Sequence, residues 1–291
     1  MKVTFAIVKR NMLNYFYDKT SIFFSMLSVM ILVLVYVFFL GQLQIDNIKD
    51  LVGEINGIDG LTLSWLVAGL VITSTVTVSM STMSDIVLDR ENKMFQDFYV
   101  APIKRGSIVV AYIISSIMIT ILMAYLTFTL GSIYIGITSS IWIPFSGWMN
   151  MFLVIVLSST LFASLSFVLL SFVKTASAAG TVNTLIGTLI GFFAGIYVPF
   201  GAFSQSFQNI IQLNPAAQIV VIMRQIMTRP YIGVVFDGAP QQAINDYESA
   251  YGIVLNVFGS ELQVSWIILI GLGWITAFIA LGLLRLRAYK E

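Results

Sequence analysis

Long stretches without a charged residue alternate along this chain with shorter segments that carry most of its Lys, Arg, Asp and Glu. A helix that crosses a bilayer needs about 20 apolar residues, because it rises 1.5 Å per residue across a hydrocarbon core of about 30 Å. The charge-free stretch 106–173 is long enough for two such helices, and Gly, Ser, Thr and Pro divide it at 131–147. The pattern predicts an all-α integral membrane protein with six spans, at about residues 21–40, 61–83, 107–130, 148–173, 177–198 and 262–284.

Residues 199–261, here called the external segment, form the largest region outside these spans. The segment contains the apolar stretch 216–227, which is too short to cross a bilayer and is typical of a re-entrant or interfacial helix. A second short helix is predicted over 247–259, with a polar loop at 230–246 between the two. Arg224 lies in the first of these helices, and its side chain is expected to extend to the outer surface.

The distribution of Lys and Arg orients the predicted spans. Of the 15 Lys and Arg residues, only Lys49, Arg224 and Arg229 would lie on one side. The side richer in Lys and Arg faces the cytoplasm, so both termini are expected there. Residues 1–20 have apolar side chains along one helical face and basic residues around it, which predicts an amphipathic helix on the inner leaflet. No cleavable signal peptide is expected, and residues 1–291 are expected to form one transmembrane domain.

The composition supports a membrane location and excludes several kinds of chemistry. The chain is 58% hydrophobic and 10% charged, against roughly 25% charged residues in a soluble domain. It has no His and no Cys, so no catalytic or metal-binding residue is predicted. There is no G-x-x-x-x-G-K-[ST] loop for ATP, and no predicted span has a charged residue at its centre, as ion-driven carriers usually do. A source of energy on another chain is therefore expected, and no nucleic acid partner is expected.

The cytoplasmic segment 90–105 is more regular than a linker between two spans requires. Asn92 would begin a short helix and Pro102 would end it. The apolar residues of this helix recur at the spacing of one face: Met94, Phe95, Phe98 and Tyr99. Either this helix lies among the lipid headgroups, or its aromatic side chains fill a groove on a partner protein.

Two predicted spans are rich in small or polar residues. In the fifth, glycines recur every four residues at Gly187, Gly191 and Gly195, which suits close helix packing inside the chain, or a dimer seam or gate. Hydroxyl groups in a span either bond to backbone and neighbouring helices or line a mildly polar translocation path. The candidates for the path are Thr73, Thr77, Ser81, Asn183, Thr184 and Thr188. Asp85 and Asp89, at the cytoplasmic edge of the second span, are expected to be solvated charges rather than proton-relay acids.

Two motifs, in order among six predicted spans, resemble those of the membrane subunit of type-2 ATP-binding-cassette (ABC) exporters. The first follows the second span and consists of Arg90-Glu91 and then Ala101-Pro102-Ile103-Lys104-Arg105. The second follows the fifth span and consists of Gly195-Ile196-Tyr197-Val198-Pro199, Leu213-Asn214-Pro215 and then Arg224. The resemblance covers nearly the whole chain.

This resemblance implies a permease that works with a separate ABC ATPase subunit and with a second permease chain, identical or related, in the plasma membrane of a bacterium. ATP and magnesium would be bound by the ATPase and not by this chain. The amphipathic helix of residues 1–20 would be a connecting helix, and residues 203–227 would be external re-entrant helices. The second and fifth spans would line the path at a dimer interface. The resemblance assigns ATPase coupling to Arg90, Glu91, Met94, Phe95, Phe98, Tyr99, Pro102, Lys104 and Arg105.

The chain departs from such exporters in residues 228–261, which are longer than the family requires and are expected to shape the exit or to bind something outside. The predicted path has no fixed charge and many aromatic and hydroxyl groups. That favours export of a lipophilic or amphipathic cargo (a drug, toxin, lipid-like molecule or peptide) over a bare ion. The alternative is a membrane scaffold or sensor that does not transport and assembles through its cytoplasmic amphipathic helix.

Overall fold

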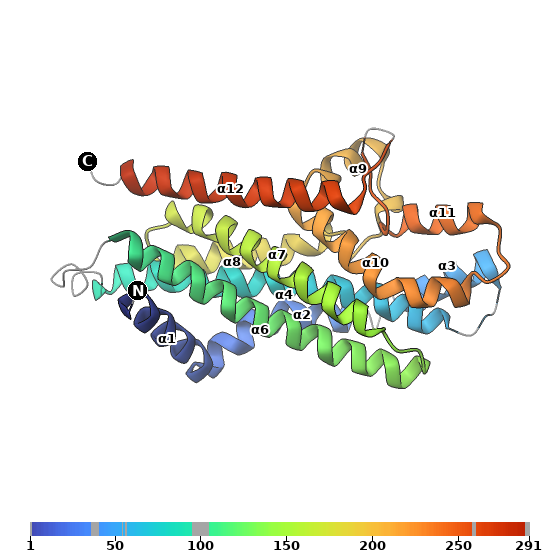
Figure 1. The fold of residues 1–291 in the computed structure, drawn as a ribbon, viewed down its shortest axis with the longest axis horizontal. Helices are drawn as coiled ribbons and strands as arrows, with labels where there is room; N and C mark the ends of the chain where they lie inside the picture. The colour runs from blue at the N-terminus through green and yellow to red at the C-terminus, as the bar shows by residue number, and fades with distance from the viewer. Residues whose placement is uncertain are drawn as a thin grey trace.

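The structure, a computed structural model, describes residues 2–35, 41–53, 55, 57–94, 105–257 and 260–288. These residues form an elongated bundle of helices (Figure 1). The long and amphipathic helices of the first two thirds are α1 (Lys2–Tyr17), α2 (Lys19–Val35), α3 (Gly41–Val52), α4 (Ile58–Glu91), α6 (Arg105–Ser139), α7 (Phe145–Ser171) and α8 (Ala176–Phe193). The remaining elements are a 3-10 turn (Phe200–Ala202), α9 (Gln205–Gln212), α10 (Pro215–Val235), α11 (Gln241–Ala250), the two-residue strands β1 (Asn256–Val257) and β2 (Ser260–Glu261), and α12 (Val264–Ala288).

Five helices of the described chain are long and apolar enough to cross a membrane: α4, α6, α7, α8 and α12. They overlap five of the six predicted spans, and α8 ends at Phe193 although its span was predicted to reach residue 198. The predicted span at 21–40 overlaps α2, but residues 36–40 lie outside the described residues, so that span stays a prediction. The start of α1 and the end of α12 lie at one end of the bundle, and α3 and α11 lie at the other (Figure 1). The first and last helices therefore have their terminal residues at the same end of the bundle, which is the arrangement that an even number of membrane crossings produces.

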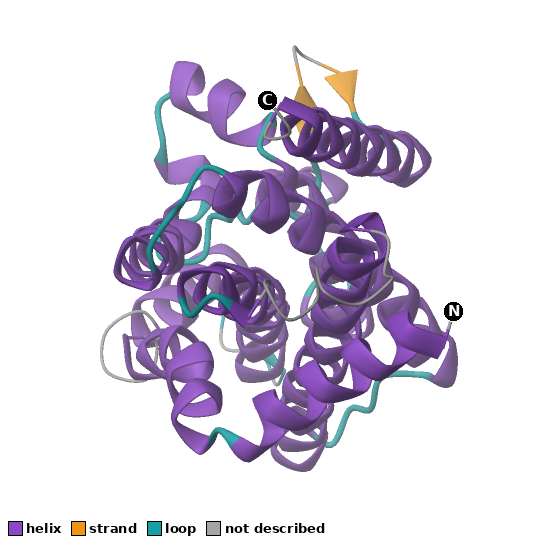
Figure 2. Cartoon of the chain, turned by 90° about the vertical axis from the view of Figure 1, so that its left-hand side faces the viewer, coloured by secondary structure: helices purple, strands orange, loops and turns teal. Residues whose placement is uncertain are grey.

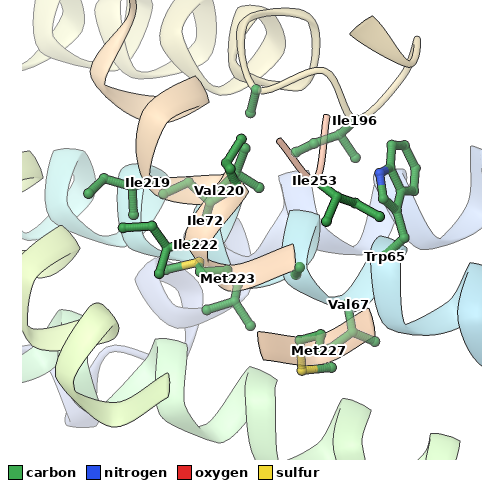
Figure 3. Packing of buried hydrophobic residues seen from close by; sticks show 14 of the residues in the cluster. Trp65, Val67, Ile72, Ile196, Ile219, Val220, Ile222, Met223, Met227 and Ile253 are labelled. Atoms are coloured by element: carbon green, nitrogen blue, oxygen red, sulfur yellow. The ribbon is translucent and has the colours of Figure 1, made fainter. Parts of the chain in front are cut away.

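Helix α4 lies at the centre of the bundle, in contact with α2, α6, α7, α8 and α10. Apolar or hydroxylated residues occupy nearly every side of α4, and a helix of that kind is stable only when it is buried on all sides. Trp65, Val67 and Ile72 of this helix belong to the same buried apolar cluster as residues of α10, and Ile196 and Ile253 lie beside Trp65 (Figure 3). On another side α6 comes close at Gly131, where a Cβ atom would lie 2.5 Å from Val67.

Two helix ends differ from the prediction. Helix α6 continues through Gly131 and Gly136 to Ser139, although these glycines were expected to divide two spans. Helix packing explains this, since both glycines admit a large neighbour, Val67 and Trp142 respectively. Asn92 does not begin a helix but ends one: it is the C-terminal cap of α4, and Lys93 follows with a left-handed φ of 60°.

The external segment is more helical than predicted. The prediction of a polar loop at 230–246 is wrong, because α10 continues through Pro230 to Val235 and α11 begins at Gln241. Tyr231 is fully buried and its hydroxyl donates a hydrogen bond to the carbonyl of Ile141, at 2.8 Å, which holds this end of α10 against the α6–α7 connection. The helix expected at 247–259 is instead the end of α11 followed by the antiparallel pair β1–β2, the two arrows in Figure 2. Helices α9 and α10 meet at 89°, the geometry of a broken span or a re-entrant loop.

Candidate functional site

At the C-terminal end of α4, Glu91 links this helix to α8. The backbone N–H of Ala176, the first residue of α8, donates a hydrogen bond of 2.5 Å to the Glu91 carboxylate. The N–H of Ala178 donates to the Thr175 hydroxyl at 3.3 Å, so two of the free N–H groups at the start of α8 have acceptors. A carboxylate is especially favourable there, because the N-terminal end of a helix carries a partial positive charge. The end of α4 and the start of α8 are therefore joined by a bond between two segments that lie far apart in the sequence.

Three of the remaining predicted coupling residues lie within the described part of the chain. Arg90 is half-buried, and Met94 is exposed just beyond the left-handed turn at Lys93. Arg105 is the first residue of α6. The other members of the predicted set lie outside the described residues: Phe95, Phe98, Tyr99, Pro102 and Lys104. Their role in coupling stays a prediction.

Helix α1 is held against α4 and α6 by a polar cluster that the sequence did not reveal, here called the α1 clamp. The Arg10 guanidinium forms an ion pair with Asp89 and donates a hydrogen bond of 2.8 Å to the Tyr112 hydroxyl, which in turn donates to Asp89. Asn11 donates to the Ser115 hydroxyl at 3.1 Å. Asp89 is only 9% exposed, so its prediction as a solvated charge is wrong. The sequence does show Arg10 as a basic residue of the N-terminal amphipathic helix, but it does not show that its partner is Asp89, 79 residues away.

Asp85 lies one turn before Asp89 and is also only partly exposed. It lines a small cavity of about 160 Å³ beside the α1 clamp, together with Asn14, Asp18 and Ser81. Ser81 is thus the one residue of the predicted path that lies at this cavity. Within the described residues no group of three or more acidic side chains is arranged to hold a metal ion.

Most hydroxyl groups of α4 form hydrogen bonds inside the chain. Thr73 and Thr77 each donate to the backbone carbonyl four residues earlier, at 2.9 Å. Ser79 bonds to Thr120 at 3.1 Å and Thr82 to Ser116 at 2.7 Å, which joins α4 to α6. Asn183 of α8 donates to the Ser84 hydroxyl at 2.9 Å and joins α8 to α4 in the same way. In this conformation the α4 hydroxyls hold helices together rather than line an open path.

One face of α8 is not covered by any other part of the described chain. The residues of this exposed α8 face combine hydroxyl and large apolar side chains: Thr181, Thr184, Leu185, Thr188, Leu189 and Phe192. Thr184 and Thr188 therefore differ from the path candidates on α4, since they face outward. Among the predicted path residues, these two are placed to meet a second chain or a cargo.

The predicted glycine row is divided between different partners. A Cβ atom on Gly191 would lie 2.1 Å from the ring of Tyr197, and one on Gly195 would lie 2.2 Å from the ring of Phe200. Gly195 also lies beyond the end of α8, with a left-handed φ of 61° that suits glycine. Gly187 is buried. At Gly191 and Gly195 the close approach is therefore to aromatic residues of the same chain.

Arg224 is fully buried, so the expectation that its side chain extends to the surface is wrong. Its guanidinium donates to four backbone carbonyls, at 2.7–3.3 Å: Ala194, Gly195, Tyr251 and Gly252. These carbonyls follow the last turns of α8 and α11, and the C-terminal end of a helix carries a partial negative charge. The guanidinium carbon also lies 4.4 Å from the centre of the Trp65 ring. Arg224 thus joins α4, α8, α10 and α11, and we call this arrangement the Arg224 node.

A family model described as ABC-2 type transporter matches residues 2–228. The match extends from α1 through the coupling segment and α8 to Arg224, and ends before α11 and the β1–β2 pair. A search of curated proteins gives no match.

Proposed function

The chain belongs to the ABC-2 type transporter family, and from this premise we propose that it exports a lipophilic or amphipathic cargo with energy from a separate ATPase. It is a multi-pass membrane protein and the permease of an ABC transporter, a family that implies an ATPase partner. In the proposed assembly two permease chains work with two ATPase chains in the plasma membrane of a bacterium. ATP and magnesium are bound by the ATPase chains.

The observation that carries this proposal is the hydrogen bond between Glu91 and Ala176. Glu91 is the last residue of α4 and belongs to residues 90–105, here called the docking segment, which we propose binds the ATPase. Ala176 is the first residue of α8. A displacement of the docking segment therefore acts on both helices together. The α1 clamp adds α1 and α6 to the same end of α4 through Asp89 and Tyr112.

The proposed path runs between the exposed α8 faces of two permease chains. Its large apolar residues suit an apolar cargo, and its hydroxyl groups offer hydrogen bonds to a polar head group. No charged residue lies on this face, so a bare ion would lose its hydration there without compensation. This is the physical reason for a lipophilic or amphipathic cargo.

Aspartate substitutions in the docking segment test the ATPase contact. We expect Phe98→Asp or Tyr99→Asp to remove most of the ATPase that co-purifies with the permease, because a carboxylate cannot be buried in an apolar groove without a large cost. Co-purification from membranes, with permease insertion measured in parallel, checks this. Val100→Asp is the matched control, because Val100 belongs to the same segment but not to the predicted apolar face. Normal ATPase recovery with Phe98→Asp and Tyr99→Asp would remove these residues from docking and favour a lipid-facing helix.

A glutamine substitution tests the link between the helices. We expect Glu91→Gln to leave ATPase co-purification intact and to reduce cargo export per ATP hydrolysed, because the neutral amide caps the start of α8 less strongly than a carboxylate. Export and ATP hydrolysis are measured together in vesicles. Asp59→Asn, at the other end of α4, is the control. Unchanged export per ATP in the Glu91 variant would contradict the proposed transmission to α8.

A further inference from the structure

A cavity of about 880 Å³ lies between α7, α10, the end of α11 and the start of α12, and no residue of the exposed α8 face lines it. It is formed mostly by the part of the chain that follows the family match and by the start of α7. Its volume lies in the range of sites that hold a lipid-sized or drug-sized molecule.

The lining of this cavity changes character along the helices. Its apolar part is formed by residues inside helices that are long enough to span a membrane and by the neighbouring α10: Leu153, Val154, Ile222, Ile226 and Ile268. Its polar part includes Asn150 and Gln225, and the charged residues that line it within the described chain are Arg229, Glu248 and Glu261. An occupant that satisfies both parts has an apolar chain and a charged head.

The charged residues of the cavity lining indicate which head group the occupant carries. Glu248, on α11, and Glu261, on β2, are near enough for the second to act on the first: burial, with a further contribution from the charge of Glu261, raises the pKa of the Glu248 carboxyl. Two such carboxylates repel each other, and a bound cation would relieve that repulsion. Arg229, on α10, is the cation of the lining and suits a phosphate group, whereas α7 and α12 contribute no charged residue to the cavity.

We propose that this cavity binds a membrane phospholipid with an ammonium group, with the ammonium at Glu248 and Glu261, the phosphate at Arg229 and an acyl chain along α7, α10 and α12. A lipid is favoured over a water-soluble cation because the apolar lining lies on helices of membrane-spanning length. The site goes beyond the proposed function, since it does not use the ATPase or the α8 path.

Two lipids with identical acyl chains, phosphatidylethanolamine and phosphatidylglycerol, test the site directly. Both carry a phosphate, and only the first carries an ammonium. The full chain in neutral maltoside micelles is mixed with each lipid, and retained lipid is counted by native mass spectrometry. We expect about a tenfold preference for phosphatidylethanolamine, as one charge-assisted contact gives. Equal retention of the two lipids by the native chain would overturn the proposal.

Variants then locate the binding. Glu248→Gln and Glu261→Gln are expected to remove the preference, whereas Arg229→Gln is expected to weaken retention of both lipids. Asp246→Asn, on α11 but outside the lining, is the matched control and should keep the preference. Lowering the pH toward the raised pKa of Glu248 should also reduce retention of phosphatidylethanolamine and leave phosphatidylglycerol unchanged, because the protonated carboxyl no longer attracts an ammonium. A preference that survives both glutamine variants would place the lipid elsewhere.

Discussion

Replacing Arg224 with methionine is expected to unfold the outer half of the bundle and to abolish export. The substitution keeps an unbranched aliphatic chain but removes the guanidinium. The carbonyls of Ala194, Gly195 and Gly252 then lose the donor that Arg224 provides, while the carbonyl of Tyr251 keeps its bond from the Trp65 indole N–H. Each buried carbonyl without a partner costs about 1–3 kcal/mol, which is a large part of the 5–15 kcal/mol that stabilises a typical domain. The measurement is thermal stability of the purified chain and its yield as a single species after extraction.

The control for this experiment is Arg229→Met on the same helix. Arg229 is exposed, so in detergent without added lipid its loss should change the free energy of unfolding by no more than about 0.5 kcal/mol. Arg224→Lys is expected to be intermediate, because an ammonium cannot reach four acceptors in the geometry of a guanidinium. Equal stability of the methionine variants at both positions would show that the four carbonyls do not depend on Arg224.

Replacing Asp89 with asparagine is expected to release α1 from the bundle. The charge of Arg10 then loses its carboxylate, and hydrogen bonds to charged groups contribute about 1.5–3 kcal/mol each. Because the chain has no cysteine, Ile7→Cys creates a single thiol on the buried side of α1. We expect the reaction of this thiol with a maleimide to be slow in the chain that retains Asp89, and more than about tenfold faster in the chain that also carries Asp89→Asn.

Asp59→Asn is the matched control for the α1 clamp, since it makes the same change at the opposite end of α4, where Asp59 is exposed. It should leave the maleimide rate at Ile7→Cys unchanged. An equally slow reaction in the Asp89 variant would mean that apolar contacts alone hold α1 in place.

The spans could be predicted from the sequence because hydropathy is a local property. A helix such as α7 is apolar whatever it contacts, and the absence of water in the bilayer requires its backbone to be helical. The residue at which a helix ends depends less on local sequence. Helix α6, for example, continues past Gly131 because Val67, on another helix, fills the space above that glycine. Helix α11 was missed for a related reason, since its polar sequence resembles a loop and only its buried Tyr247 shows that it packs on the bundle.

The polar contacts could not be predicted, because each depends on residues far apart in the chain. Arg224 was expected at the surface, where a lone arginine in an apolar helix would be hydrated. Its acceptors are backbone carbonyls, which have no signature in the sequence, and they belong to residues 27–30 positions away. Asp89 is similar: next to Arg90 it looks like one of several solvated charges, and only the fold brings Arg10 and Tyr112 to it.

The length of α4 has a mechanical consequence. Its 34 residues extend about 50 Å without a break, while the hydrocarbon core is about 30 Å thick. A continuous helix that is held along its middle tilts more easily than it bends, so sideways movement of its C-terminal end shifts its N-terminal end in the opposite direction. Trp65, which covers Arg224, lies in the N-terminal part of this helix. A push at Glu91 would therefore reach the Arg224 node as a tilt, without a relay of individual side chains between the two ends.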